Sequence, residues 1–229
     1  MMHSERITSW VVVPAYNESR VLGETISELL SVFINIVVVD DCSSDQTSDV
    51  AYSAGAHVCR HPVNLGQGAA LATGIAYALQ NGASEIVTFD GDGQHSVEDA
   101  RILCELRRLN DVDAVLGSRF LGRTVGISAR KKIFLLLATL FTRLTTGLAL
   151  TDTHNGLRVF SRHAAHQIRI RQNRMAHASE ILHEIAEHKL SYIEAPCTVT
   201  YSEYSKTKGQ KMSGAFAILS DLMLGRLHR

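Results

Sequence analysis

Short apolar runs alternate with longer amphipathic segments along the first half of the chain. The run Trp10-Val11-Val12-Val13 ends at Pro14, and a continuous apolar run of this kind is typical of a strand buried on both faces. From Glu18 to Val32 the apolar residues recur at helical spacing, which predicts a helix. The run from Ile34 to Val39 predicts a second buried strand. The chain therefore opens with a strand, a helix and another strand.

The same alternation continues to about residue 120. We expect strands at 10–13, 34–39, 57–60, 86–89 and 114–116, and helices at 18–32, 44–54, 66–79 and 96–109. Because strands that alternate with helices pair in parallel through crossover connections, this order predicts an α/β fold. Its sheet should be mainly parallel, with helices on both faces.

The second half of the chain is less regular. We expect a basic amphipathic helix at 128–148, a strand at 157–160, a helix at 176–188, short strands near Ile193 and Val199, and a terminal helix from Gly214. The length of 229 residues favours one domain, 1–229, with a first part at about 8–120 and a second at about 121–229.

Charge and cysteine content exclude several classes of protein. Basic and acidic residues both number 23, so no basic field favours a nucleic-acid partner. The four cysteines form no C-x-x-C pair, which favours a reducing compartment over a zinc site or disulfide framework. Residues 1–10 lack the apolar run of a secretory signal, and 133–141 is shorter than the roughly 20 residues that span a bilayer. We therefore expect a cytoplasmic protein, and the sequence leaves open a homo-oligomer.

An acidic turn follows the strand expected at 86–89. It reads Asp90-Gly91-Asp92-Gly93-Gln94-His95, and its glycines let the backbone turn sharply. Two carboxylates one residue apart repel each other unless a cation lies between them, and a hard ion such as Mg²⁺ or Mn²⁺ suits this donor set. The alternative is structural, in which one aspartate caps the helix that begins near Ser96.

Two other strands also end in polar clusters. Pro14-Ala15-Tyr16-Asn17-Glu18 follows the first, and Asp40-Asp41-Cys42-Ser43-Ser44-Asp45 follows the second. Because ligands bind at the carboxyl ends of parallel strands, we expect all three clusters along one edge of the sheet. An aromatic surface, hydrogen-bond acceptors and a metal site together predict a pocket for a nucleotide diphosphate. The glycine-rich signatures of Rossmann dehydrogenases and P-loop proteins do not match this sequence.

Six motifs in order resemble those of a known enzyme family. They are Val13-Pro14-Ala15-Tyr16-Asn17-Glu18, Val39-Asp40-Asp41-Cys42-Ser43-Ser44-Asp45-Gln46-Thr47, Asn64-Leu65-Gly66-Gln67-Gly68, Asp90-Gly91-Asp92-Gly93-Gln94-His95, Gly117-Ser118-Arg119-Phe120 and Asp152-Thr153-His154-Asn155-Gly156-Leu157-Arg158. The chain resembles a family 2 glycosyltransferase with the Rossmann-like GT-A fold. Within that family it resembles the dolichol-phosphate mannosyltransferase and polyprenyl-phosphate glycosyltransferase branch. The resemblance implies transfer of a sugar from a nucleotide-sugar with inversion at the anomeric carbon. The first half would bind the donor and the second half the acceptor.

The resemblance also implies roles for individual residues. Those that would line the nucleotide are Pro14, Tyr16, Asn17 and Glu18, and Asp41 would bond the base. Those that would hold Mg²⁺ or Mn²⁺ with the donor's diphosphate are Asp90, Asp92 and Gln94. Further donor-binding candidates are Arg158, Lys206 and Lys208. The catalytic candidates are Asp92, Arg119, Arg130 and Glu180.

Three departures from the family pattern affect these assignments. Cys42 replaces a usual glycine, and Gln67 stands where lysine is common. The segment 201–209 contains no arginine, so both Lys206 and Lys208 are candidates for the late phosphate ligand.

The acceptor is left open between two classes. A polyprenyl phosphate, dolichyl or undecaprenyl, is already an anion and needs only cations to hold it. The candidate cations are Arg119, Arg130, Lys131 and Lys132. A hydroxyl of a lipid-linked or cell-surface glycan would instead need a general base, for which Glu180 is a candidate. The aspartate that usually follows this glutamate in hydroxyl-transferring members is missing, which favours Glu180 as a structural or an acceptor-side carboxylate. A sugar-1-phosphate nucleotidyltransferase is disfavoured, because no glycine-rich loop follows the first strand.

Two further patterns have both a functional and an ordinary explanation. The basic run 130–132 and the apolar run 133–137 suit a helix lying at the inner, cytosolic face of a membrane, where the protein would bind peripherally. They equally suit the start of an ordinary packed helix. The segment from His183 to His188 resembles a zinc motif, but its second histidine is one position late for H-E-x-x-H, so we expect a solvated helix face.

Overall fold

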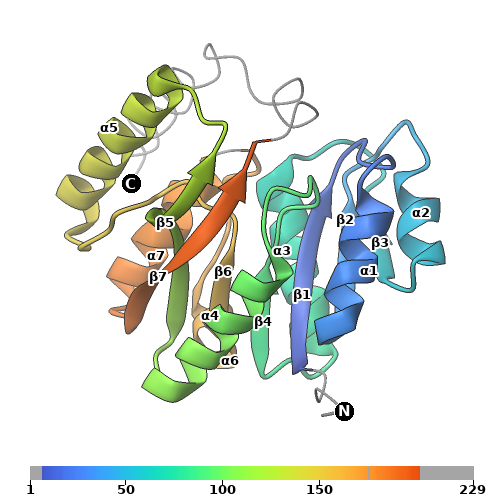
Figure 1. Ribbon diagram of the computed structural model, residues 1–229. Helices are drawn as coiled ribbons and strands as arrows, with labels where there is room; N and C mark the ends of the chain where they lie inside the picture. The colour runs from blue at the N-terminus through green and yellow to red at the C-terminus, as the bar shows by residue number, and fades with distance from the viewer. Residues whose placement is uncertain (1–6, 175, 202–229) are drawn as a thin grey trace, which may run out of the picture.

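Seven strands form one sheet in the computed structural model, which describes residues 7–174 and 176–201 (Figure 1). The strands are β1 (Ile7–Ala15), β2 (Phe33–Asp40), β3 (His57–Arg60), β4 (Glu85–Thr88), β5 (Ala114–Val125), β6 (Arg158–Ser161) and β7 (Tyr192–Thr200). The helices are α1 (Leu22–Val32), α2 (Thr47–Ser53), α3 (Gln67–Gln80), α4 (Val97–Asn110), α5 (Ala129–Thr146), α6 (Arg162–Gln167) and α7 (His177–Glu187). The strand order is β3-β2-β1-β4-β6-β5-β7. The α/β class is confirmed.

The position of β1 explains how distant motifs meet. It pairs in parallel with β2 on one side and with β4 on the other. The carboxyl ends of these three strands therefore lie at the same edge of the sheet, as the sequence predicts. β6 runs antiparallel to both β4 and β5, whereas β5 and β7 are parallel. The sheet is thus mainly parallel, with one reversed strand inside it.

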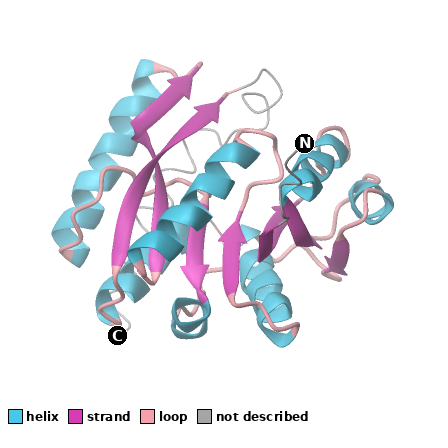
Figure 2. Cartoon of the chain, turned by 60° about the horizontal axis from the view of Figure 1, so that its bottom comes forward, coloured by secondary structure: helices cyan, strands magenta, loops and turns pink. Residues whose placement is uncertain are grey.

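Helices lie on both sides of the sheet (Figure 2), and alternate residues of β1 show why. Val11 and Val13 pack in a core with side chains of α1 and α4. Trp10 and Val12 pack on the other face with side chains of α3, α6 and α7. All four side chains are buried. Burial on both faces is the reason that this strand is a continuous apolar run.

The last strand differs from the sequence expectation. The two short strands expected near Ile193 and Val199 are one continuous strand, β7. It contains Pro196, which has no amide hydrogen to donate, and β7 accommodates it because it lies at the edge of the sheet. The terminal helix expected from Gly214 lies outside the described residues.

β5 and α6 also differ from expectation. β5 continues to Val125 instead of ending at Leu116, and its glycines interrupt the apolar pattern that marked the strand. One of them is required by packing, since a Cβ at Gly122 would lie 2.2 Å from the carbonyl oxygen of Cys197. The short helix α6 was not predicted.

The close approach of α3 to β1 can be tested by adding volume at Gly74. A Cβ there would lie 2.3 Å from Cγ1 of Val12, which is buried. We predict that Gly74→Val lowers the free energy of unfolding by about 2–3 kcal/mol through overpacking. The matched control is Ala76→Val, on the exposed side of the same helix, which should change it by less than about 0.5 kcal/mol. Urea denaturation measures both, and equal effects would contradict the packing described.

Candidate active site

A cavity of about 1200 Å³ lies at the carboxyl ends of β1, β2 and β4. Its walls come from the loops after these strands, from the start of α3, and from α5 and α7. Small-molecule sites typically have volumes of roughly 300–1,000 Å³. The cavity therefore has room for more than one substrate.

The loop after β1 supplies one end of the cavity. Tyr16 and Glu18 of this loop line the cavity with Pro14 from the end of β1, and Tyr16 exposes 47% of its surface. An exposed aromatic ring at a cavity edge suits stacking against a nucleotide base. Asn17 is not among the lining residues. Its backbone is left-handed with φ of 55°, and its Oδ1 accepts a hydrogen bond of 2.8 Å from the backbone N–H of Ser44. Asn17 therefore ties together the loops after β1 and β2.

Asp41 is buried, and its carboxylate holds the loop that precedes α3. Oδ1 accepts a hydrogen bond of 2.8 Å from the backbone N–H of Leu65, and Oδ2 accepts one of 2.6 Å from Gly66. The Nδ1 atom of His61 lies 2.8 Å from the same Oδ1. Asp41 also lines the cavity. It shapes the wall beside the nucleotide end, and its contact with a base stays a prediction.

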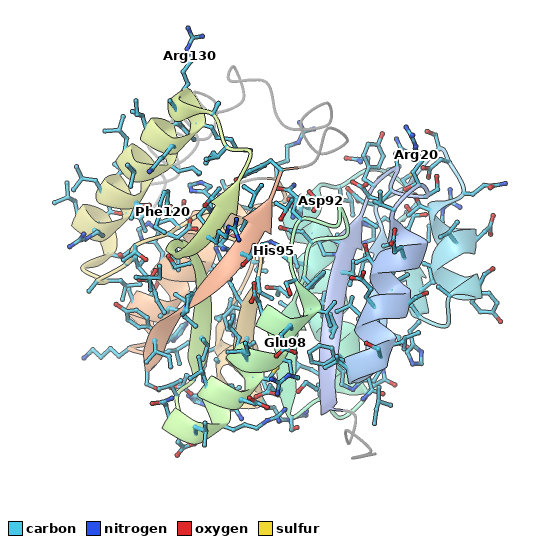
Figure 3. All side chains as sticks on the ribbon, in the orientation of Figure 1. Arg20, Asp92, His95, Glu98, Phe120 and Arg130 are labelled. Carbon is cyan, nitrogen blue, oxygen red and sulfur yellow. The ribbon has the colours of Figure 1, made fainter. Side chains whose placement is uncertain are left out.

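Asp90 and Asp92 follow β4, and Figure 3 labels Asp92 and the nearby His95. Oδ1 of Asp90 accepts a hydrogen bond of 2.9 Å from Nε2 of Gln67, and its Oδ2 lies 3.2 Å from Nε2 of His95. The backbone and side-chain amides of Gln94 donate to Asp92. These bonds direct both carboxylates to groups around the cavity and not to the first turn of α4, so they do not support the helix-capping alternative.

The two carboxylates disturb each other's ionisation. Burial and the negative charge of Asp90 raise the pKa of Asp92 to about 6. Burial, the largest effect, would raise the pKa of Asp90, but the hydrogen bond with His95 and nearby positive charges, including that of Arg158, together outweigh it and lower that pKa. A divalent cation between the carboxylates would remove their repulsion. Two carboxylates with the side-chain oxygen of Gln94 are the oxygen donors that Mg²⁺ and Mn²⁺ prefer. The residues present therefore fit such an ion.

Segments distant in sequence fix the position of Asp90. Gln67, where the family commonly has lysine, donates to it from the start of α3. Gly156 packs against its other oxygen, since a Cβ there would lie 2.1 Å from Oδ2 of Asp90. Any larger residue at position 156 would therefore displace the carboxylate.

Two predicted arginines line the cavity and are themselves buried. Arg158 donates a hydrogen bond of 3.0 Å to the carbonyl of Asn155, and burial lowers its pKa to about 10. Nε of Arg119 donates a hydrogen bond of 2.6 Å to Oδ2 of Asp152, and its Nη1 donates one of 2.6 Å to the hydroxyl of Tyr201. Fixed hydrogen bonds thus hold both positive charges at the wall.

Of the expected cations on α5, Lys131 lines the cavity and the catalytic candidate Arg130 does not. Arg130 is exposed, and Figure 3 shows its side chain pointing away from the molecule at the end of α5. The next residue, Lys131, lines the cavity, and its Nζ lies 4.2 Å from the ring centre of Tyr201. Successive helical residues point about 100° apart, so the two side chains take different directions. Burial and the charge of Arg119 lower the pKa of Lys131.

Glu180 is not among the residues that line the cavity. Its Oε2 accepts hydrogen bonds from the backbone N–H groups of Arg171 (2.9 Å) and Gln172 (2.8 Å). Both belong to residues 168–174, which join α6 to α7 and are called here the connecting segment. Burial raises the pKa of Glu180. These contacts favour the structural interpretation of this carboxylate.

The connecting segment in turn caps α3. The carbonyl of Asn173 accepts hydrogen bonds from the backbone N–H groups of Gly68 (2.8 Å) and Ala69 (3.3 Å), in the first turn of that helix. First-turn amides have no partner within their own helix. Glu180 therefore holds a segment that stabilises the helix carrying Gln67, and through Gln67 it acts on Asp90.

The zinc-like sequence on α7 makes an ordinary helix. Among residues 7–174 and 176–201, no group of three or more His, Cys, Asp or Glu side chains could hold a metal ion. Oε2 of Glu184 accepts a hydrogen bond of 3.1 Å from the backbone N–H of Arg169 and lies 3.5 Å from Nε2 of His188. The same finding means that an ion at Asp90 and Asp92 would need further oxygens from a substrate.

Sequence reasoning assigned no role to two histidines of the cavity wall. His154 and His177 line it, and burial lowers the pKa of each to about 4. An isolated histidine has no spacing signature, so no sequence signal marked His177. Lys206 and Lys208 lie outside the described residues.

Residues 10–169 match the family described as Glycosyl transferase family 2. The chain belongs to this family. The family 2 chain is 37% identical over 223 residues to an uncharacterized protein of Methanocaldococcus jannaschii, covering 95% of this chain and 92% of that one. It is 30% identical over 239 residues to the UDP-N-acetylglucosamine–dolichyl-phosphate N-acetylglucosaminyltransferase of Methanococcus voltae, covering 94% of each.

A solved structure confirms the fold. The chain superposes with a TM-score of 0.73 on the crystal structure of glucosyl-3-phosphoglycerate synthase from Mycobacterium tuberculosis in complex with Mn²⁺ and uridine-diphosphate-glucose. The two are 18% identical, and the match covers 94% of this chain and 76% of the other. The expected GT-A fold is confirmed.

The role of Glu180 can be tested by removing its charge. A general base typically contributes about 10²–10⁴-fold in rate, so a structural carboxylate predicts that Glu180→Gln lowers kcat less than about tenfold. Hydrogen exchange at the amides of Arg171 and Gln172 should become faster, because the amide oxygen is a weaker acceptor than the carboxylate. Glu187→Gln, at the exposed end of the same helix, is the control. A thousandfold loss of kcat with unchanged exchange would make Glu180 the base.

Proposed function

We propose that this protein transfers a sugar from a nucleotide-sugar to a polyprenyl phosphate at the cytosolic face of a membrane. The reaction depends on Mg²⁺ or Mn²⁺ and inverts the anomeric carbon. The observation that carries the proposal is that one cavity is lined both by the carboxylates at the strand ends and by Lys131 of α5, which forms no ion pair with a described residue. The name of the relative from Methanococcus voltae supports a lipid-phosphate acceptor.

The donor half of the cavity is built from the strand ends. Tyr16 provides a stacking surface for the base, and the acidic pair that follows β4 holds the metal with the diphosphate. When bound, the metal supplies a Lewis acid that neutralises charge on the departing diphosphate. The hydrogen bonds from Gln67 and His95 hold Asp90 in place before the substrate arrives. Such preorganisation lowers the cost of reaching the reactive arrangement.

The other half of the cavity favours an anionic acceptor. The carboxylates that line the cavity in the described chain are Glu18, Asp41, Asp90 and Asp92, and all follow the three donor strands. No carboxylate from the described part of α5 or α7 lines it to remove a proton from a hydroxyl. Lys131 and Arg119 offer positive charge there, and Lys131 forms no ion pair with a described residue. A phosphate needs such cations and no base.

α5 suits a lipid-bearing acceptor. Its large exposed apolar side chains are Ile133, Leu136, Leu137, Leu140 and Leu144. The helix also carries basic residues and no acidic one. In the described part of the chain, no helix has the length and hydropathy needed to span a membrane. An apolar stripe flanked by cations suits a helix lying in the membrane interface. The phosphate of a lipid held there would lie beside Lys131.

The acceptor site can be tested with neighbouring lysine and arginine variants. We predict that Lys131→Ala raises KM for a short-chain polyprenyl phosphate by about tenfold or more, because it removes a charge-assisted contact. Arg130→Ala, one residue earlier and pointing away, should change KM less than about threefold when the acceptor is presented in detergent micelles. Turnover with polyprenyl phosphate is compared with turnover with a sugar-bearing lipid, using the same donor. Preference for the sugar-bearing lipid, or a larger effect of Arg130→Ala, would contradict the proposal.

A further inference from the structure

His177 is the first residue of α7 and lies in the cavity wall. Only 6% of its surface is exposed. It sits against the start of α3, since a Cβ at Gly68 would lie 2.9 Å from the Cβ of His177. Gln67, the neighbour of Gly68, donates to Asp90. His177 therefore lies near Asp90, where the proposed diphosphate would bind.

The backbone fixes the tautomer of this imidazole. Nδ1 lies 2.8 Å from the carbonyl oxygen of Arg174, in the connecting segment. A carbonyl oxygen only accepts hydrogen bonds, so Nδ1 must carry the hydrogen. Burial and the positive charge of Arg158 lower the pKa of His177, which keeps the ring neutral near pH 7. Nε2 is then a pure acceptor.

No described residue donates a hydrogen bond to Nε2 of His177. An acceptor on the cavity wall that no described residue satisfies is open to a ligand that brings a donor. An ionised diphosphate has no hydrogen to donate. The base lies at the other end of the cavity, beside Tyr16. The ribose and the transferred sugar both carry hydroxyl donors, and the sugar lies beyond the diphosphate, on the side away from the base.

The geometry points to a sugar-reading contact, in which Nε2 of His177 accepts a hydrogen bond from a hydroxyl of the donor's sugar. This inference rests on the proposed function and adds to it a residue that selects the sugar. The connecting segment supports this contact, because the Arg174 carbonyl holds the ring of His177 in the tautomer whose Nε2 accepts.

Two substitutions separate the sugar contact from a purely structural role. In His177→Asn the side-chain amide can still donate to the Arg174 carbonyl, but nothing replaces Nε2. In His177→Gln an amide oxygen can reach the position of Nε2, while the donor to Arg174 is lost. The sugar contact predicts that Asn is the damaging change, and a structural role predicts that Gln is.

The measurement is calorimetric binding with Mn²⁺ present. The probes are UDP and GDP alone, and UDP-N-acetylglucosamine, UDP-glucose and GDP-mannose. We expect His177→Asn to bind the preferred nucleotide-sugar roughly tenfold more weakly than the unmodified protein, which is the usual effect of one hydrogen bond. Its affinity for the nucleoside diphosphate should be unchanged. His177→Gln should retain the nucleotide-sugar affinity within about threefold.

Other results would overturn the inference. Unchanged nucleotide-sugar binding by His177→Asn, or an equal loss by both variants, would show that Nε2 does not contact the sugar. A loss of nucleoside diphosphate affinity equal to that of the nucleotide-sugar would do the same. If the unmodified protein binds none of the five probes, the proposed function itself is wrong, and that failure is distinct from the others. Thermal unfolding of each variant confirms that it is folded.

Discussion

The repulsion between Asp90 and Asp92 is the constraint on which the rest of the cavity depends. One residue separates the two carboxylates, and burial with the charge of Asp90 raises the pKa of Asp92 to about 6. The described side chains and backbone offset this repulsion with hydrogen bonds from the amides of Gln67 and Gln94 and from His95. A site that is incomplete without a cation is suited to bind its metal together with an anionic substrate, because each makes the other more favourable.

The residues that hold Asp90 and Asp92 in place come from distant parts of the chain. Glu180 holds the connecting segment by two backbone amides, and that segment caps α3 through the carbonyl of Asn173. α3 begins with Gln67, which donates to Asp90. The same segment orients His177 through the Arg174 carbonyl. A carboxylate outside the cavity can therefore influence the donor without contacting it. This arrangement explains why a glutamate at this position need not be a base.

The strand ends could be predicted from the sequence, but several side-chain directions could not. Buried parallel strands leave a strong signal, so the meeting of the loops after β1, β2 and β4 followed from their apolar runs. The reversal of β6 leaves none, because a short apolar strand has the same pattern in either direction. Arg130 and Lys131 are both basic, and only the rotation of α5 decides which faces the cavity. The partners of Glu180 are backbone amides, which have no sequence signature.

The most direct test of the account is the dependence of nucleotide binding on the metal. Calorimetric titration of UDP and GDP, with and without Mn²⁺, compares the unmodified protein with Asp92→Asn. Asp111→Asn, an exposed carboxylate after α4, is the control. The account predicts that Mn²⁺ strengthens nucleotide binding by the unmodified protein and by Asp111→Asn, and that Asp92→Asn loses most of this gain. A nucleotide affinity that does not change with Mn²⁺, or an equal gain in affinity in Asp92→Asn, would contradict it.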